Sequence, residues 1–457
     1  MEKRKFETMV ICSTLNQMVN YVAIKKHGIK NIINITGEEN KNDKGEKNKK
    51  VHANLKKFNY KEWDKNLKET LGINDFEKNI GFGNYQVKNH NQMIKKLADT
   101  CDSIAQPILW NITGGQRHIV MAITEYVLNQ EKNDNRKNDV IVYFEGDTEK
   151  FLYYGNTKEE LSKQIKNDYD CEINIPLAFR LMGMDIKERE EYKTSAYYKV
   201  FFEKEKDAKK VDQYEKYMEE YEFYKEFYDK YNQNEKILKI SSRSNKDKTD
   251  EKKDETKLDG VIRSLKEQGL DRFLNKTNAV DKTNEAIFRV SMGNYKEGKI
   301  FGYILEKMAF YKMIEIIKEN NLKNIVDIDT SVKINFSDKK QRVSEHAIDE
   351  FDIVLVSKIG KVIIFECKSG AMCGDNAKST HYSTYKVSGV YGTPVLIDPL
   401  TNEEWLDEFD KINSAEKAAS KAGLIVCRMG SKGNTDEDKG IYTLENYLEN
   451  VFKNEEE

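Results

Sequence analysis

Short apolar runs alternate with amphipathic stretches through roughly the first third of the chain. The apolar runs are rich in Ile and Val and end in small polar residues, a pattern that predicts buried strands. They are ETMVICST (7–14), IINIT (32–36), PILWNIT (107–113) and VIVYFEG (140–146). Segments 91–105 and 116–130 between them have the spacing of helices. Strands alternating with helices predict a parallel sheet covered on both faces, and such sheets bind ligands where loops leave the carboxyl ends of the strands.

A second α/β pattern begins near residue 286. It opens with a strongly amphipathic helix at 299–321 and continues with three strand candidates, a helical stretch to about residue 390, and two further strands around a helix. The strand candidates are 325–336, 351–357, 361–367, 393–398 and 422–428, and the later helix is 402–421. This order predicts a compact α/β domain with a mixed sheet.

The region between these patterns, 186–285, has a different character. Six tyrosines recur at alternating steps of three and four, which on a helix forms one continuous stripe; they are Tyr214, Tyr217, Tyr221, Tyr224, Tyr228 and Tyr231. Such a stripe is typical of a seam that packs against another helix, and the alternative is an exposed row that stacks on nucleic-acid bases. The following segment, 241–257, lacks apolar residues and mixes charges, which predicts a solvated linker. We therefore expect a helical, charged insertion.

Composition limits the classes of function. A chain of 457 residues is long enough for two or three domains, and 76 Lys plus Arg against 78 Asp plus Glu leave a net charge of −2. Any nucleic-acid binding must therefore come from a local patch. The six cysteines contain no CxxC pair, so neither a disulfide framework nor a zinc site is indicated. We expect a cytoplasmic protein, because no signal peptide and no apolar run of about eighteen residues is visible.

The hairpin FDIVLVSKIGKVIIFECKSG (351–370) carries charges at the ends of two oily strands. Glu366 and Lys368 lie two residues apart and so share one face of a strand, and the register expected for a hairpin turning at 358–361 places Asp352 near Glu366. Two carboxylates at close range repel unless a cation lies between them, and oxygen ligands without His or Cys favour Mg²⁺ or Mn²⁺. The alternative is that these are strand-end charges in solvent.

One further acidic residue extends this candidate site. Glu306 lies on the preceding amphipathic helix, flanked by apolar positions expected to face the sheet, and it is either the polar edge of that helix or another metal ligand. A divalent cation polarises a phosphodiester and activates a water, while Lys368 would orient that water or stabilise developing charge. The predicted chemistry is phosphodiester hydrolysis.

Two loops of the first pattern follow strands and carry polar groups. STLNQ (13–17) follows the first strand, and TGGQRH (113–118) follows the strand ILWN. Gly114 and Gly115 allow close backbone approach, while the neighbouring side chains supply hydrogen bonds and a fixed charge. The alternative is a tight turn that precedes a helix. Neither a P-loop nor a GxGxxG fingerprint is present.

Asp352, thirteen intervening residues and then Glu366-x-Lys368, in α-β-β-β-α-β order, resemble the PD-(D/E)xK nuclease superfamily. Where relatives often show an Asn-Glu pair before the strand acid, this chain has Asp349 and Glu350. The loops ICSTLNQ and ITGGQRH resemble those of CARF domains, which sense cyclic oligoadenylates in type III CRISPR defence. Together the two resemblances match a known family of CRISPR ancillary nucleases.

This resemblance implies an α/β architecture with a Rossmann-like CARF domain at 1–185, the insertion at 186–285 and a restriction-endonuclease-like PD-(D/E)xK domain at 286–457. It implies an allosterically activated endonuclease that uses Mn²⁺ or Mg²⁺, forms a homodimer, binds cyclic tetra-adenylate and cuts single-stranded RNA, DNA or both. The implied ligand-binding residues are Ser13, Thr14, Asn16, Gln17, Thr113, Gly114, Gly115, Gln116 and Arg117. The implied catalytic residues are Glu306, Asp352, Glu366 and Lys368, of which the three acids also bind metal.

Two alternatives remain open at this point. One is a restriction- or repair-type nuclease that cuts DNA duplexes independently of cyclic oligoadenylate. The other is a ligand-sensing regulator whose nuclease-like domain is inactive, although the complete Asp, Glu and Lys set argues against it.

Overall fold

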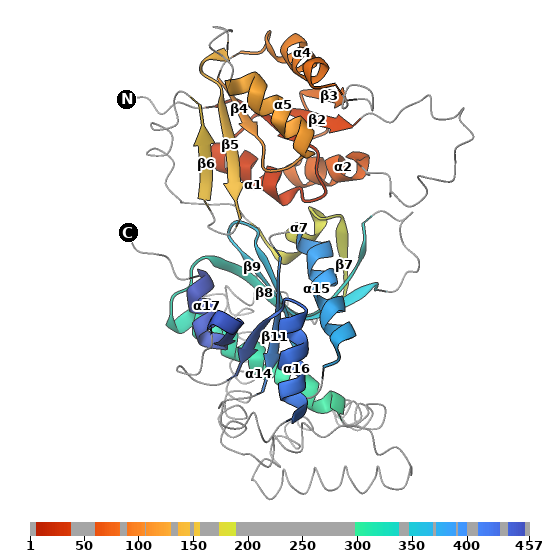
Figure 1. Ribbon diagram of the computed structural model, residues 1–457, viewed down its shortest axis with the longest axis vertical. Coiled ribbons are helices and arrows are strands. Elements are labelled where there is room, and N and C mark those ends of the chain that lie inside the picture. Colours follow the sequence, from red (N-terminus) through yellow and green to blue (C-terminus); the bar gives the residue numbers. More distant parts are fainter. Residues whose placement is uncertain are drawn as a thin grey trace, which may run out of the picture.

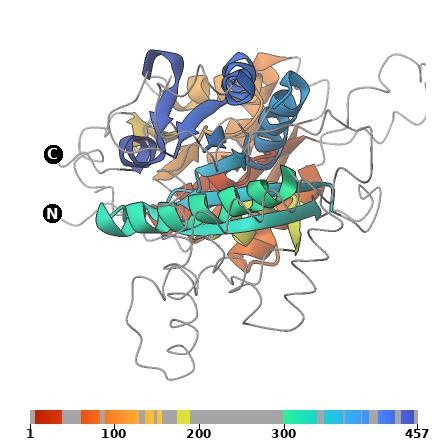
Figure 2. The same cartoon turned by 90° about the horizontal axis from the view of Figure 1, so that it is seen from below.

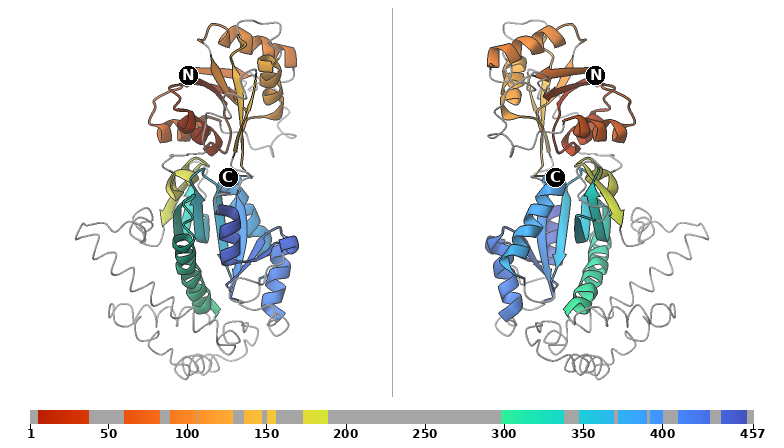
Figure 3. Two further views of the ribbon diagram at one scale, coloured as in Figure 1. Left: turned by 90° about the vertical axis from the view of Figure 1, so that its left-hand side faces the viewer. Right: turned by 90° about the vertical axis from the view of Figure 1, so that its right-hand side faces the viewer.

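The structure is a computed structural model of the whole chain. It describes residues 6–37, 60–82, 89–105, 107–128, 136–146, 150–155, 173–188, 298–337, 347–368, 372–389, 392–399, 410–429 and 437–452. The tyrosine stripe at 214–231 and the charged segment at 241–257 lie outside these described residues. Figures 1 and 3 show two α/β units stacked along the long axis.

The N-terminal unit is built on a six-stranded sheet of order β3-β2-β1-β4-β5-β6. Its strands are β1 (Thr8–Cys12), β2 (Asn31–Gly37), β3 (Lys78–Phe82), β4 (Ile108–Asn111), β5 (Val140–Glu145) and β6 (Lys150–Tyr154). The four predicted strands are confirmed, and β1 to β5 pair in parallel. The sequence did not indicate β3 or β6, and β6 pairs with β5 in the antiparallel sense. The parallel sheet therefore has one antiparallel edge strand, a common addition to doubly wound sheets.

Both faces of this sheet are covered, which explains why its central strands are continuously apolar. Met9 and Ile11 of β1 belong to one buried cluster with α1 (Met18–His27), while Val10 and Cys12 belong to another with α4 (His90–Cys101) and α5 (Arg117–Leu128). A further helix, α2 (Tyr60–Leu71), follows β2 in the described part of the chain. The order of strands reverses between β1 and β4, so the loops that follow these two strands lie at the switch point where doubly wound sheets bind ligands.

The C-terminal unit contains the predicted mixed sheet, with seven strands in the order β13-β12-β11-β10-β9-β8-β7. Its strands are β7 (Met184–Glu188), β8 (Ile325–Phe336), β9 (Asp349–Ser357), β10 (Val362–Cys367), β11 (Thr393–Asp398), β12 (Ile425–Arg428) and β13 (Ile441–Thr443). The strands from β7 to β10 pair antiparallel, and those from β10 to β13 pair parallel. Strand β7 comes from the chain just before the long undescribed segment and forms an edge of this second sheet.

Among the described residues, several long helices pack on this second sheet. They are α14 (Gly298–Glu319), α15 (Gly374–Ser388), α16 (Asp410–Lys421) and α17 (Leu444–Phe452). Helix α14 runs along the sheet and is well seen from below in Figure 2. Within the described residues, no helix is long and apolar enough to span a bilayer.

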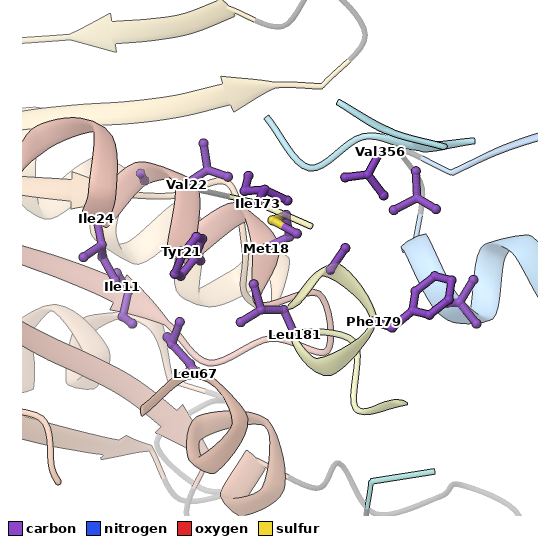
Figure 4. Packing of buried hydrophobic residues seen from close by; sticks show 14 of the residues in the cluster. Ile11, Met18, Tyr21, Val22, Ile24, Leu67, Ile173, Phe179, Leu181 and Val356 are labelled. Carbon is purple, nitrogen blue, oxygen red and sulfur yellow. The ribbon is translucent and has the colours of Figure 1, made fainter. Parts of the chain in front are cut away.

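A continuous apolar core joins the two units. One buried cluster includes residues of β1 and α1 together with Val354 and Val356 of β9 and Val362 of β10. Helix α7 (Ile175–Arg180) adds Phe179 between them, as the close view in Figure 4 shows. Every residue of α1 from Met18 to Ile24 is buried, because one side of this helix contacts its own sheet and another faces the C-terminal unit. The ligand-side loop after β1 therefore leads directly into the contact between units.

Candidate nuclease and ligand sites

Asp352 of β9 and Glu366 of β10 lie where these two strands separate. Their antiparallel ladder ends at the pair Ile353 and Phe365, which are the immediate neighbours of Asp352 and Glu366 in the chain. The Oδ2 atom of Asp352 accepts a hydrogen bond of 2.7 Å from the backbone N–H of Cys367. Beyond that point β10 continues beside β11, since the N–H of Lys368 donates to the carbonyl of Ile397 at 2.9 Å. The opening between the strands leaves room for side-chain chemistry.

The strand on the other side of β9 is also irregular at this position. Bridge pairs join Thr330 with Ile353 and Val332 with Phe351, while the intervening Ser331 and Asp352 form no bridge pair. Ser331 has a positive φ of 51°, which is uncommon for a residue with a Cβ. Backbone held in a sparsely populated conformation is retained where the surrounding structure enforces it, and it is frequent beside functional residues.

Glu366 and Lys368 contact each other through an ion pair. Burial disfavours the charged ammonium of Lys368, but the nearby carboxylates of Glu366 and Asp352 outweigh this effect and raise its pKa. Lys368 therefore remains protonated and neutralises part of the negative charge of the site.

Glu306 on α14 approaches the same group of charges. Burial, followed by the charge of Asp352, raises the pKa of Glu306 to about 8. Burial, followed by the charge of Glu366, raises the pKa of Asp352 to about 7. These mutual effects show that the structure brings together the four side chains that the sequence singled out, and that they are not strand-end charges in open solvent.

The donor set suits a hard divalent cation by its chemistry, because it consists of partly buried carboxylates that repel one another. In the described residues, however, no group of three or more His, Cys, Asp or Glu side chains is arranged to hold a metal ion. Within this set, Glu366 forms an ion pair with Lys368, whose ammonium offsets part of the acids' charge. The chemistry of the residues fits Mg²⁺ or Mn²⁺, and binding would require Glu366 to exchange its Lys368 contact for the ion.

The second candidate site lies at the switch point of the N-terminal sheet. The two glycines of the turn after β4 pack tightly on the end of β1: a Cβ added to Gly114 would lie 2.8 Å from Cγ2 of Thr14, and one added to Gly115 would lie 2.6 Å from Cβ of Cys12. Gly115 also has a φ of +101°, which favours glycine. The Gly-Gly turn thus brings the two predicted ligand loops into contact.

The polar groups of these loops face helix α2. The Oδ1 atom of Asp64 accepts hydrogen bonds from Oγ of Ser13 at 2.5 Å and from Nε2 of Gln17 at 3.4 Å. Its Oδ2 atom accepts from Nδ2 of Asn34 at 2.9 Å, and Gln116 donates to the hydroxyl of Tyr60. Burial raises the pKa of the Asp64 carboxyl to about 6 even though these donors favour its charged form.

The remaining predicted ligand residues have different surroundings. The Oγ1 atom of Thr113 accepts the N–H of Phe144 at 2.7 Å, which fixes this loop to β5. Arg117 is exposed at the start of α5. The side chain of Asn16 instead points to the C-terminal unit, where its Nδ2 donates to the carbonyl of Ser388 at 3.2 Å.

Sequence reasoning did not identify Asn34, Tyr60 or Asp64 as members of this site. Asn34 is a buried polar residue inside a strand, which is a weak signal of function. Tyr60 and Asp64 lie in YKEWDKNLKETL, an ordinary amphipathic helix with no recognisable motif. Only the packing of α2 over the switch point reveals these two residues.

Comparisons with known proteins address the fold. No protein-family model matches the chain, and no curated protein matches it. The solved structure of protein VC1899 from Vibrio cholerae aligns with a TM-score of 0.56 at 13% identity, over 98% of this chain and 98% of that chain. This likeness shows that the two-unit α/β fold is shared along the whole length.

Two other solved structures align at lower scores. Can2 from Sulfobacillus thermosulfidooxidans, in complex with cyclic tetra-adenylate, has a TM-score of 0.49 at 13% identity, over 98% of this chain and 97% of that chain. A type III CRISPR defence DNA nuclease activated by cyclic oligoadenylate has a TM-score of 0.44 at 11% identity, over 99% of this chain and 52% of that chain.

Proposed function

We propose that this protein is a metal-dependent endonuclease, activated by a cyclic oligoadenylate, that degrades single-stranded RNA, DNA or both in type III CRISPR defence. The observation that carries the proposal is the convergence of Glu306, Asp352 and Glu366 around the ammonium of Lys368. Partly buried carboxylates with raised pKa values, here Glu306 and Asp352, beside a cationic side chain are typical of a catalytic centre rather than a solvated surface. The motif resemblance of these residues to the PD-(D/E)xK superfamily supports the same chemistry.

Each residue of the group has a distinct proposed task. A Mg²⁺ or Mn²⁺ ion held by Asp352, Glu366 and Glu306 would polarise the phosphodiester and lower the pKa of a bound water. The N–H of Cys367 holds the Asp352 carboxylate in place, so this acid is oriented before substrate arrives. Lys368 would stabilise the negative charge that develops on the phosphate as water adds to phosphorus and the P–O bond breaks.

The proposed activator site is the switch point of the N-terminal sheet, within residues 1–185. Ser13, Thr14, Gln17 and Gln116 offer donors and acceptors there, and Gly114 and Gly115 allow close approach to the backbone. Arg117 adds a positive charge at the start of a twelve-residue helix, where the exposed N–H groups also favour anions. A ring of nucleotides with internal two-fold symmetry would suit a homodimer, because each subunit would present the same loops.

The proposal is tested with purified full-length protein, Mn²⁺, and end-labelled single-stranded RNA and DNA, with and without cyclic tetra-adenylate. We expect cleavage that depends on both the metal and the activator. Full activity without the activator would overturn the switch and favour a nuclease under other control. Metal binding without cleavage of any strand, with or without activator, would overturn the enzymatic proposal.

A further inference from the structure

The loop after β1 has contacts on two sides, and different residues of the loop make the contacts on each side. We define the coupling loop as residues Ser13 to Met18. On the ligand side, Ser13 and Gln17 donate to the carboxylate of Asp64. On the opposite side, Asn16 and Met18 contact the C-terminal unit. Because the loop is so short, a structural change on one of its two sides must also shift the backbone that carries the residues on the other side.

Asn16 is anchored to the end of helix α15. Its Nδ2 atom donates to the carbonyl of Ser388 at 3.2 Å, and its Oδ1 atom accepts the N–H of Met18 at 3.1 Å. The next residue along α15, Gly389, has a φ of +65°, and a Cβ added there would lie 3.0 Å from Nδ2 of Asn16. Both polar atoms of Asn16 are therefore engaged within the fold, and the bare glycine backbone lets the asparagine approach.

Met18 meets the turn of the hairpin that carries the proposed catalytic acids. Gly360 in the turn between β9 and β10 has a φ of +78°, and a Cβ added to it would lie 2.5 Å from Cγ of Met18. The Met18 side chain is buried in the cluster that joins the units, together with Val356 and Val362 on either side of that turn. Figure 4 shows Met18 on the side of α1 that faces Val356.

The two contacts reach the proposed nuclease site by rigid elements. From the turn at Gly360, β9 leads back to Asp352 and β10 leads on to Glu366. Helix α15 ends at Ser388 beside Asn16, and its Ser383 donates a hydrogen bond to Asp349 of β9. Packed strands and helices move as units rather than bending continuously, so a displacement at one end is felt at the other.

From these contacts we infer that the coupling loop transmits activator binding to the nuclease site, with Asn16 and Met18 as positioning residues. This inference rests on the proposed function. An activator whose phosphates or bases take over the donors of Ser13 and Gln17 must displace Asp64 from them and shift the loop. The shift reaches the hairpin through Met18 and α15 through Asn16. Activation requires that the activator bind more tightly to the shifted state than to the present one.

The inference is tested by separating activator affinity from activation. Asn16→Asp keeps the acceptor for the N–H of Met18 and loses the donor to Ser388, whereas Asn16→Ala loses both. Activator affinity is measured by calorimetry, and the ratio of cleavage rates with and without saturating cyclic tetra-adenylate is measured in the same preparations. We expect both variants to bind the activator and their activation ratio to fall roughly tenfold or more, the scale of a typical coupling free energy.

A second pair of variants tests the contact from the nuclease side. Gly360→Ala places a methyl group against Met18 at a positive φ, and Gly440→Ala imposes the same backbone strain at φ +69° with nothing within 4 Å. By reciprocity, Gly360→Ala should change activator affinity although it lies in the other unit, and Gly440→Ala should leave affinity unchanged. Circular dichroism and thermal melting confirm that each variant is folded.

The outcomes distinguish the inference from the proposed function. Suppose that the wild type is activated, that the Asn16 variants are activated equally, and that Gly360→Ala binds the activator like the wild type. The coupling inference is then overturned, while the proposed function stands. If the wild type shows no response to the activator, both are overturned. Loss of activator binding in Asn16→Ala and Asn16→Asp would also overturn the coupling inference, because Asn16 would then contact the activator directly.

Discussion

The carboxylate of Asp352 on β9 accepts the backbone N–H of Cys367 on β10 at a distance of 2.7 Å. This hydrogen bond replaces the next rung of a ladder that ends at Ile353 and Phe365. The side chain of Asp352 thus links the two strands where their backbone pairing has ended. The hydrogen bond explains how the Asp352 carboxylate is held in place although the pairing of β9 with β10 has stopped.

Replacing Glu366 with Gln should reduce activated cleavage by at least about a hundredfold, because the neutral amide neither balances Lys368 nor serves as an anionic metal ligand. The measurement is the single-turnover rate with Mn²⁺ and activator, with metal affinity followed by calorimetry. Glu350→Gln is the matched control, since Glu350 is exposed and yet close enough to raise the pKa of both Glu306 and Asp352. A Glu366→Gln enzyme with the wild-type rate would remove the hairpin from catalysis.

Replacing Asp64 with Asn should increase the affinity for cyclic tetra-adenylate by roughly tenfold. The carboxylate of Asp64 occupies the donors of Ser13 and Gln17 and carries a negative charge near the proposed path of the phosphates. The amide is nearly isosteric, and the Oδ1 atom of Asn34 has no hydrogen-bond partner among the described residues, so it is available to accept from the new amide. Glu62→Gln on the same helix is the control.

Calorimetry with each variant measures this change. A tenfold loss of affinity in Asp64→Asn, with Glu62→Gln unchanged, would contradict the prediction. It would show that the carboxylate accepts a hydrogen bond from the activator instead of competing with it.

The same carboxyl should make stability depend on pH in a defined direction. Burial raises its pKa from 3.8 to about 6, so between these values the folded protein holds a proton that the unfolded chain releases. The folded state therefore gains stability as the pH falls through 6 and loses it as the pH rises through 6. When the pH is lowered from 7.5 to 5.0, the free energy of unfolding of the wild type should rise by roughly 1 kcal/mol relative to that of Asp64→Asn.

Urea unfolding of both proteins at the two pH values measures that difference. Other buried acids titrate in this range as well, and the comparison with Asp64→Asn cancels their contribution because both proteins contain them. An identical pH dependence in the two proteins would show that Asp64 is not buried as described.

The fold was predictable from sequence where burial is two-sided. Strands such as β1 and β10 are continuously apolar because helices cover both faces of their sheets, and such runs are easily recognised. The edge strands β3 (KNIGF) and β6 (KFLYY) were missed, because these partly exposed strands offer at most a short apolar run. Helix α1 gives no amphipathic signal because its residues from Met18 to Ile24 are buried on all sides.

The residues of the candidate sites likewise divide into those that the sequence predicted and those that it did not. Asp352, Glu366 and Lys368 are close in sequence and belong to one hairpin, so their spacing alone predicts that they lie near one another. Asp64 reaches Ser13 across 51 residues, and Asn16 reaches Ser388 across 372. No local pattern encodes such contacts, since they depend on how α2 packs on its sheet and how the two units meet.

Arg117→Ala should weaken activator binding about tenfold while leaving metal binding unchanged. Arg117 is exposed at the first position of α5, beside the Gly-Gly turn, where its charge and the helix N-terminus both favour a phosphate. The affinity loss should shrink as salt is raised from 50 to about 300 mM, because an exposed charge contact is screened. Lys30→Ala is the control: Lys30 is an exposed cation just before β2, at the amino ends of the strands and so at the opposite edge of the sheet. Equal affinities of Arg117→Ala and wild type at low salt would exclude Arg117 from the activator site, whereas equal losses in both variants would indicate attraction by overall charge and no specific contact.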